Sequence, residues 1–233
     1  MVLTLPVSVQ AECRQALALG LDVSGSVDAR EYRLQLDGLA LALGDPEVTA
    51  ALLSQPGSPV RIAVYEWSAP NDDRLILNWT DINAPSDITA IQAILRQTRR
   101  ADMGPSTGLG AALRVGFTLL DQQSECWTRT LDISGDGKAN TGQRPQDIAE
   151  PPDDIIVNGL AIGEDNAATA DGQSLQMGEL TAYYTAYVIR GPGAFVETAL
   201  GFDSYAEAMR RKLLRELRTV AIGQLSPTPH SYQ

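Results

Sequence analysis

Short apolar runs alternate with amphipathic stretches along most of this chain. Between the runs, apolar residues recur at helical spacing, as Leu109, Leu113 and Phe117 do. Parallel neighbouring strands need a crossover connection, which is usually a helix, so the alternation predicts an α/β fold with a mainly parallel sheet covered by helices. The runs that we expect to form buried strands are 17–21, 60–67, 130–134, 155–162 and 187–189.

Two segments depart from this alternation. The run at 75–79 follows the second expected strand after a turn-rich link that is too short for a helix, so we expect an antiparallel edge strand there. Residues 163–178 contain Glu-Asp-Asn and Asp-Gly sequences, which favour turns. We expect them to form a long surface loop or an irregular insertion.

The length of 233 residues suffices for one large domain with a buried core, which we expect over 13–224. Residues 1–12 end an apolar stretch in Val-Gln-Ala, so they are either the remnant of a secretory signal peptide or a frayed terminus. The Pro- and Ser-rich tail, 225–233, is expected to be disordered. No run approaches the roughly 20 apolar residues of a transmembrane helix.

The charge of the chain bears on its partners. With 29 acidic and 18 basic residues, the formal net charge is −11. This balance disfavours nucleic acid and anionic membrane surfaces as partners. The sequence does not indicate an oligomeric state.

The segment after the first expected strand carries the first candidate functional residues. Asp22 ends the apolar run, and Ser24 and Ser26 follow at intervals of two. Asp28 and Glu31 then have the spacing of a capping box, which predicts a helix start. The carboxylate and the hydroxyls are therefore expected on a turn at the carboxyl end of a strand, where open α/β sheets bind ligands.

Two later segments carry similar groups. Thr107 precedes a helical stripe and, considered alone, is explained as a helix cap. Asp136 follows the strand at 130–134 and, considered alone, is explained as part of an Asp-Gly turn. All three segments, however, follow elements of one sheet and are expected to meet at one edge of it.

Two carboxylates and three hydroxyls form an all-oxygen ligand set. Mg²⁺ and Mn²⁺ prefer such ligands, and Ca²⁺ is a further candidate, whereas zinc favours His or Cys. The single histidine, His230, lies in the tail, so zinc is disfavoured. We identify no catalytic residue and expect a divalent cation held by Asp22, Ser24, Ser26, Thr107 and Asp136.

These three motifs resemble the metal-ion-dependent adhesion site (MIDAS) of the von Willebrand factor A (VWA) domain. The matching strings are D-x-S-x-S from Asp22, T-G-L-G-A-A-L from Thr107 and S-G-D-G around Asp136. The resemblance implies a doubly wound, Rossmann-like sheet with helices on both faces. In the family's third motif the aspartate directly follows a Ser or Thr, whereas Gly135 intervenes here. Asp132 is therefore a competing candidate, although it falls within the expected strand.

A narrower resemblance, carried by "DISGDGKANTG", "VIRGPGAFV" and "YAEAMRRKLLREL", is to a bacterial VWA-like family of unknown function. The wider family binds protein ligands through an Asp or Glu that completes the cation's coordination, which implies a metal-dependent protein-binding module. Metal-dependent phosphoryl transfer or hydrolysis is the alternative from the enzyme class. A degenerate structural domain that binds no metal is the third possibility.

The two cysteines are expected to form a disulfide. Cys13 lies nine residues before Asp22, and Cys126 lies ten before Asp136, with Gly135 as the extra residue. In a sheet of order 3-2-1-4-5-6 the first and fourth strands are parallel neighbours, which places both cysteines at the end opposite the metal site. A disulfide indicates a periplasmic or secreted protein.

Overall fold

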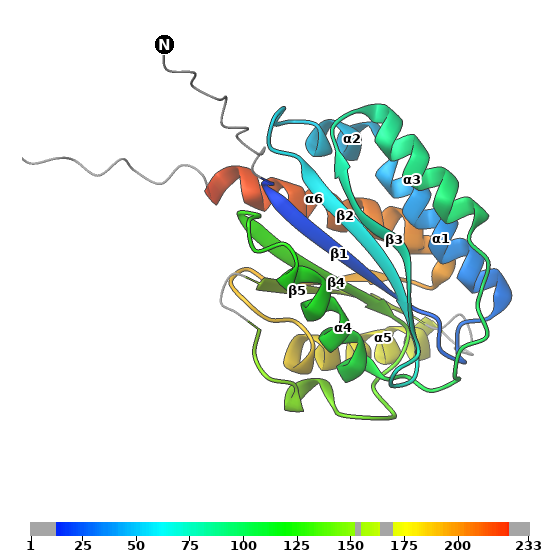
Figure 1. Ribbon diagram of the computed structural model, residues 1–233. Coiled ribbons are helices and arrows are strands. Elements are labelled where there is room, and N and C mark those ends of the chain that lie inside the picture. Colours follow the sequence, from blue (N-terminus) through cyan, green and yellow to red (C-terminus); the bar gives the residue numbers. More distant parts are fainter. Residues whose placement is uncertain (1–12, 152–154, 164–169, 224–233) are drawn as a thin grey trace, which may run out of the picture.

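A six-stranded sheet in the order β3-β2-β1-β4-β5-β6 forms the centre of the protein (Figure 1). The computed structural model describes residues 13–151, 155–163 and 170–223. The segments expected to be a signal remnant or frayed terminus, 1–12, and a disordered tail, 225–233, lie outside the described residues. The strands are β1 (Gln15–Asp22), β2 (Val60–Trp67), β3 (Asp73–Ile82), β4 (Thr128–Gly135), β5 (Ile155–Ile162) and β6 (Val196–Ala199).

All neighbouring strands are parallel except β2 and β3, which pair antiparallel at one edge of the sheet. This arrangement confirms the predicted mainly parallel sheet with one antiparallel edge strand. It also confirms that β1 and β4 are neighbours, with Leu21 opposite Ser134 in the register.

Helices cover both faces of the sheet. Figure 1 shows α4 and α5 on one face and α1 and α6 on the other. The helices are α1 (Ala29–Leu43), α2 (Pro46–Leu52), α3 (Pro85–Gln97), α4 (Leu109–Asp121), α5 (Ala170–Tyr187) and α6 (Tyr205–Gly223), and two short 3₁₀ turns lie at Pro145–Asp147 and Phe202–Ser204. Among the described helices, none combines the length and the apolar character that crossing a membrane requires.

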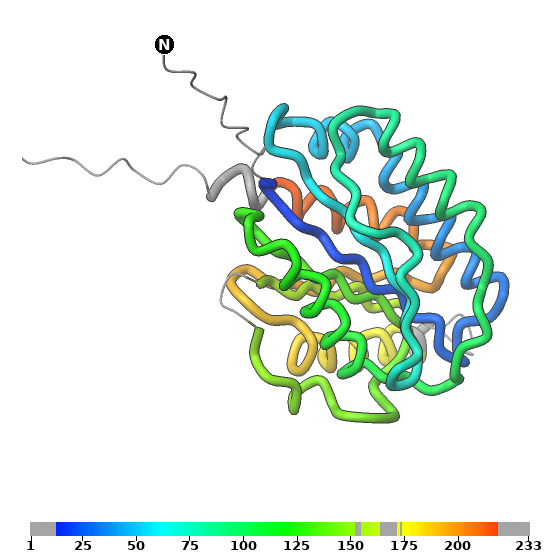
Figure 2. Tube along the Cα trace, in the orientation of Figure 1, coloured from blue at the N-terminus to red at the C-terminus, as the bar shows by residue number. Residues whose placement is uncertain are grey.

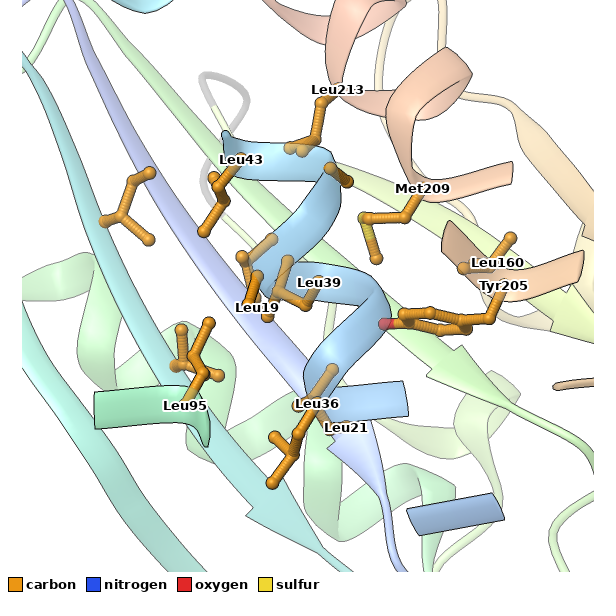
Figure 3. Close-up of a cluster of buried hydrophobic side chains, with 14 of the residues drawn as sticks. Leu19, Leu21, Leu36, Leu39, Leu43, Leu95, Leu160, Tyr205, Met209 and Leu213 are labelled. Carbon is orange, nitrogen blue, oxygen red and sulfur yellow. The ribbon is translucent and has the colours of Figure 1, made fainter. Parts of the chain in front are cut away.

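The central strand β1 is buried along its whole length because helices pack on both of its faces. Leu19 and Leu21 lie in the apolar cluster with α1 and α6, whereas Ala16 and Ala18 belong to the cluster on the opposite face. In Figure 3, Leu39 of α1 lies close to Leu19. This packing fixes the direction of β1 and with it the position where Asp22 ends the strand.

Two sequence expectations are wrong. The segment expected to be a loop, 163–178, contains the start of α5 at Ala170, and its residues 164–169 lie outside the described residues. Met177, Leu180 and Tyr184 are buried at helical spacing, a pattern that the preceding Asp-Gly pair obscured.

The strand expected at 187–189 is likewise absent from the described fold. Tyr187 ends α5, and the following Ile189 and Arg190 contribute only an isolated bridge between Arg190 and Val157. Gly191 and Gly193, with φ of 90° and 73°, then turn the chain into β6, which is the actual edge strand. Val188 is buried in the apolar cluster on the α5 side of the sheet, whereas Tyr187 is exposed.

A disulfide joins Cys13 and Cys126 at the end of the sheet opposite Asp22, and their Cα atoms are 4.4 Å apart. The pair continues the β1–β4 register backwards from Gln15 opposite Thr128, and the amide of Trp127 donates a hydrogen bond to the Cys13 carbonyl. The predicted pairing is therefore present.

Candidate metal centre

The three loops predicted to carry ligands meet at the carboxyl edge of the sheet. β1 and β4 run side by side and end together (Figure 2). The loop before α4 approaches the β1 loop so closely that the amide of Gly25 donates a 2.8 Å hydrogen bond to the carbonyl of Pro105. A Cβ atom at Gly25 would lie 2.9 Å from that same carbonyl oxygen, so the approach requires glycine.

The first loop turns sharply after Asp22. The amide of Ser24 donates a 2.8 Å hydrogen bond to Oδ1 of Asp22, which orients the carboxylate. Asp28 and Glu31 form the predicted capping box and start α1. Asp22 and Ser24 are fully buried, whereas Ser26 is exposed.

The side-chain oxygens of Ser24, Ser26, Thr107 and Asp136 lie in one contiguous cluster, and hydrogen bonds from Ser24 join Asp22 to it. Ser26 donates a 2.9 Å hydrogen bond to Oδ1 of Asp136, and the Ser24 and Ser26 hydroxyl oxygens are 3.4 Å apart. Thr107 Oγ1 lies 3.4 Å from Ser24 Oγ. Neighbouring ligands of an octahedral ion with bonds of 2.0–2.1 Å are about 3 Å apart, so these spacings are close to those of a cation shell.

Thr107 does not cap α4. The N-cap residue is Gly108, without a side-chain hydrogen bond, and the Thr107 hydroxyl lies against Ser24 instead. The explanation of this residue as a helix cap is therefore wrong. Its 5% exposed side chain is part of the oxygen cluster.

The surroundings of Asp22 disfavour its charged form when no cation is bound. Its Oδ2 is buried without a hydrogen-bond partner. Burial, followed by the charge of Asp136, raises the pKa of Asp22 to about 7, although hydrogen bonds from Ser24 and the charge of Arg100 act in the opposite direction. A divalent cation would supply the positive charge that this carboxylate lacks.

The inserted Gly135 has a steric explanation. A Cβ atom at this position would lie 2.8 Å from Oδ2 of Asp22 and 2.7 Å from the hydroxyl of Tyr184. Any larger residue would therefore press on the carboxylate and on a phenol that is itself buried without a hydrogen-bond partner. The departure from the VWA pattern keeps this space open.

The competing candidate, Asp132, lies elsewhere. Oδ2 of Asp132 lies 2.7 Å from the ammonium of Lys212, a fully buried residue of α6, and Lys212 also pairs with Glu216 at 2.6 Å. Asp132 thus binds the C-terminal helix to the sheet. Asp136, in the turn after β4, is the carboxylate in the oxygen cluster.

Sequence reasoning missed two residues that support the cluster. Asn140 accepts a 2.8 Å hydrogen bond from the amide of Thr107 and lies 3.5 Å from its hydroxyl, so it joins the second loop to the third. Arg100 donates to the backbone carbonyls of Val23, Ser24 and Val27 and holds the first loop in place. Neither follows a recognisable motif, because each contacts the cluster through tertiary packing.

The donor set fits a hard divalent cation. Within the described part of the chain, no three His, Cys, Asp or Glu residues gather where they could hold a metal, so a carboxylate-rich or zinc-type centre is not found there. The cluster instead combines two carboxylates with three hydroxyls, which suits Mg²⁺ or Mn²⁺ that retain water ligands.

The sequence family described as a protein of unknown function, DUF1194, matches residues 12–221. The chain belongs to the DUF1194 family. No functionally curated protein matches this DUF1194 sequence significantly. The membership confirms the resemblance to a VWA-like family of unknown function.

Solved structures show that the DUF1194 chain has a VWA-like fold. Proximal thread matrix protein 1 from the mussel byssus aligns with a TM-score of 0.58 at 13% identity, over 90% of this chain and 47% of its own. The pilus adhesin SpaC from Lactobacillus rhamnosus GG aligns with a TM-score of 0.54 at 15% identity, over 89% of this chain and 30% of its own. A von Willebrand factor type A protein from Catenulispora acidiphila aligns with a TM-score of 0.52 at 15% identity, over 88% of this chain and 43% of its own. The DUF1194 chain thus spans less than half the length of each.

Proposed function

We propose that this protein is a metal-dependent protein-binding module. Asp22, Ser24, Ser26 and Thr107 supply oxygen ligands to one Mg²⁺ or Mn²⁺ ion, and Asp136 contacts it directly or through water. The observation that carries the proposal is the buried Oδ2 of Asp22, which has no hydrogen-bond partner in an otherwise connected oxygen cluster.

The charge of the cluster indicates the partner's chemistry. Two carboxylates balance the charge of a divalent cation, and the three hydroxyl ligands are neutral. Because the site carries no excess negative charge, the ion can still accept an anionic ligand. An octahedral ion held by these groups retains a position for water or an outside ligand. A carboxylate from an Asp or Glu of a protein partner is the ligand that we infer for this position.

Structural relatives support the proposal at the level of the fold. SpaC is a pilus adhesin, and one structure of the mussel thread matrix protein has a zinc-occupied MIDAS motif. That second structure aligns at a TM-score of 0.55 and 15% identity, over 90% of this chain and 49% of its own. The same fold is therefore found in an adhesin and in a protein whose MIDAS motif holds a metal ion.

A binding role is favoured over metal-dependent hydrolysis because hydrolysis requires a general base or a cationic phosphate clamp beside the ion. Within the part of the chain that the structure describes, two cations lie near the cluster, and both are engaged elsewhere. Lys138, beside the third loop, pairs with Glu179 at 3.1 Å, and Arg100 donates hydrogen bonds to the backbone carbonyls of Val23 and Ser24. The single histidine, His230, lies outside the described residues. Turnover of a generic phosphate ester that requires Mg²⁺ and is lost in Asp22→Ala would favour the enzyme.

The disulfide supports a periplasmic or secreted location. Structural disulfides persist in oxidising compartments and are rare in the cytosol of mesophilic organisms. Cys13 and Cys126 are bonded and buried, so the bond is part of the fold. We therefore expect the partner in the cell envelope or outside the cell.

Capture of envelope proteins on the immobilised protein tests the proposed function. We expect a partner that is retained in Mg²⁺, released by chelator and not captured by Asp22→Ala. Asp121→Ala is the matched control, because Asp121 is an exposed carboxylate at the end of α4, away from the cluster. Capture that is unchanged by chelator and by Asp22→Ala would contradict the proposal.

A further inference from the structure

A hollow lined by four arginines adjoins the loop after β1 through Arg100, in a chain whose net charge is −11. Its volume is about 680 Å³, and its arginines are Arg33 of α1, Arg96 of α3, and Arg99 and Arg100 of the segment after α3. We call it the arginine groove. Such a concentration of one charge sign in an acidic protein attracts ligands of the opposite sign.

Buried contacts hold the groove in shape. Tyr32 lies at its floor, with the guanidinium groups of Arg33 and Arg100 at 6.0 Å and 5.9 Å from the ring centre. The Tyr32 hydroxyl donates a 2.6 Å hydrogen bond to Glu66, a fully buried carboxylate on β2 that also pairs with Arg74. The part of the groove around Tyr32 is therefore anchored to the sheet.

The backbone of the same segment is fixed as well. Arg33 donates a 2.8 Å hydrogen bond to the carbonyl of Thr98, and Arg74 donates one of 2.9 Å to the carbonyl of Arg99. A segment held in place loses little conformational entropy when it binds a ligand, which increases affinity.

Two of the four arginines are available for a ligand. Arg33 pairs with Asp37, and Arg100 donates to backbone carbonyls. The side chains of Arg96 and Arg99 are exposed and make no ion pair within the described part of the chain. They are the groups that can bind carboxylates from outside.

Arg100 connects the groove to the loop that carries Ser24. It lines the groove and donates to the carbonyl of Ser24, whose hydroxyl belongs to the oxygen cluster. A partner segment whose carboxylate reaches the cation would bring its neighbouring residues toward the groove.

We infer that the partner presents an acidic segment, with one carboxylate at the cation and further Asp or Glu residues against Arg96 and Arg99. The inference rests on the proposed function, because the cation fixes one end of the segment. Single exposed ion pairs contribute little, so the groove acts through several charges together and its contribution falls as salt increases.

Fluorescence anisotropy of a labelled decaglutamate peptide tests the inference with the full chain. In chelator, where only the groove can act, we expect Arg96→Glu/Arg99→Glu to weaken binding by about tenfold or more. The matched double variant Arg114→Glu/Arg218→Glu makes the same charge change at exposed positions on α4 and α6, and it should stay within about twofold of wild type. Equal loss in both double variants, or no detectable peptide binding by wild type, would overturn the inference.

Added Mg²⁺ separates this inference from the proposed function. A gain in peptide affinity with Mg²⁺ that Asp22→Ala abolishes supports the metal centre, whatever the arginines do. If peptide binding depends on Arg96 and Arg99 but does not increase with Mg²⁺, the groove is supported as a binding site and the proposed metal-dependent function is contradicted. A sulfated oligosaccharide that binds through the same arginines, while the peptide does not bind, would replace the acidic protein segment as ligand and overturn the inference.

Discussion

The hydroxyl of Ser26 donates a 2.9 Å hydrogen bond to Oδ1 of Asp136, across 110 residues of sequence. The contact joins the loop after β1 to the loop after β4, and Ser24 extends it to Thr107 before α4. Three separate loops therefore share one oxygen cluster. Its most buried carboxylate, Asp22, determines how the metal-free protein should behave.

Replacing Asp22 by Asn should stabilise the metal-free protein above neutral pH. The pKa of Asp22 in the folded protein is raised from 3.8 to about 7, so the folded state retains a proton that the unfolded state has lost between these values. The free energy of unfolding of the wild type should therefore fall relative to that of Asp22→Asn as the pH rises from 3.8 to about 7, by on the order of 4 kcal/mol. Urea unfolding in chelator, at several pH values from about 4 to 8, measures the difference.

Asp132→Asn is the control for burial of a carboxylate. Burial raises the pKa of Asp132 to about 7 as well, although the charge of Lys212 opposes the shift. Unlike Asp22, Asp132 pairs with a buried ammonium, so Asp132→Asn leaves Lys212 with Glu216 as its remaining partner and should cost about 3–5 kcal/mol. Equal destabilisation by Asp22→Asn and Asp132→Asn would mean that Asp22 has a structural role in the metal-free fold.

Gly135→Ala should destabilise the protein and weaken cation binding together. The new methyl group would lie within 3 Å of both Asp22 Oδ2 and the Tyr184 hydroxyl, and β4 is packed too tightly to move away. Overpacking of this kind costs about 1–3 kcal/mol.

Gly178→Ala is the matched substitution for Gly135→Ala. Gly178 is exposed on α5, and a Cβ atom there meets nothing within 4 Å, so this variant should be slightly more stable than wild type. Thermal unfolding of both variants, with and without Mg²⁺, tests the comparison. A Gly135→Ala variant that matches wild type in both conditions would refute the steric explanation.

Reduction of the disulfide should destabilise the fold without preventing cation binding. The bond joins residues 113 positions apart, and closing a loop of this length contributes about 4–5 kcal/mol in the chain-entropy model. Cys13→Ser/Cys126→Ser should therefore unfold at lower urea but titrate with Mn²⁺ as wild type does, because the cysteines lie at the opposite end of the sheet. Freely alkylated thiols in protein exported to the periplasm would contradict the bond.

Several features were predictable from the sequence because their causes are local or periodic. The apolar runs identified β1, β2, β4 and β5, and the spacing of Asp28 and Glu31 identified the start of α1. The ligand candidates followed from motifs at strand ends, and the cysteine pairing followed from strand order.

Other features depend on tertiary packing that no short motif indicates. The helical spacing of Met177, Leu180 and Tyr184 was obscured by an Asp-Gly pair, so the start of α5 was missed. Asn140 and Arg100 act on the cluster through contacts with segments distant in sequence. Asp22 Oδ2 is buried without a hydrogen-bond partner, and burial together with the nearby charge of Asp136 raises the pKa of Asp22; neither the burial nor the position of Asp136 can be read from the sequence.

Calorimetric titration of the metal-free protein with Mn²⁺ and with Mg²⁺ tests the central claim most directly. We predict one cation per chain for wild type and for Asp121→Ala, and no binding at millimolar concentrations for Asp22→Ala. Wild-type protein that binds neither ion, or Asp22→Ala protein that binds as wild type does, would contradict the assignment of a cation to this cluster.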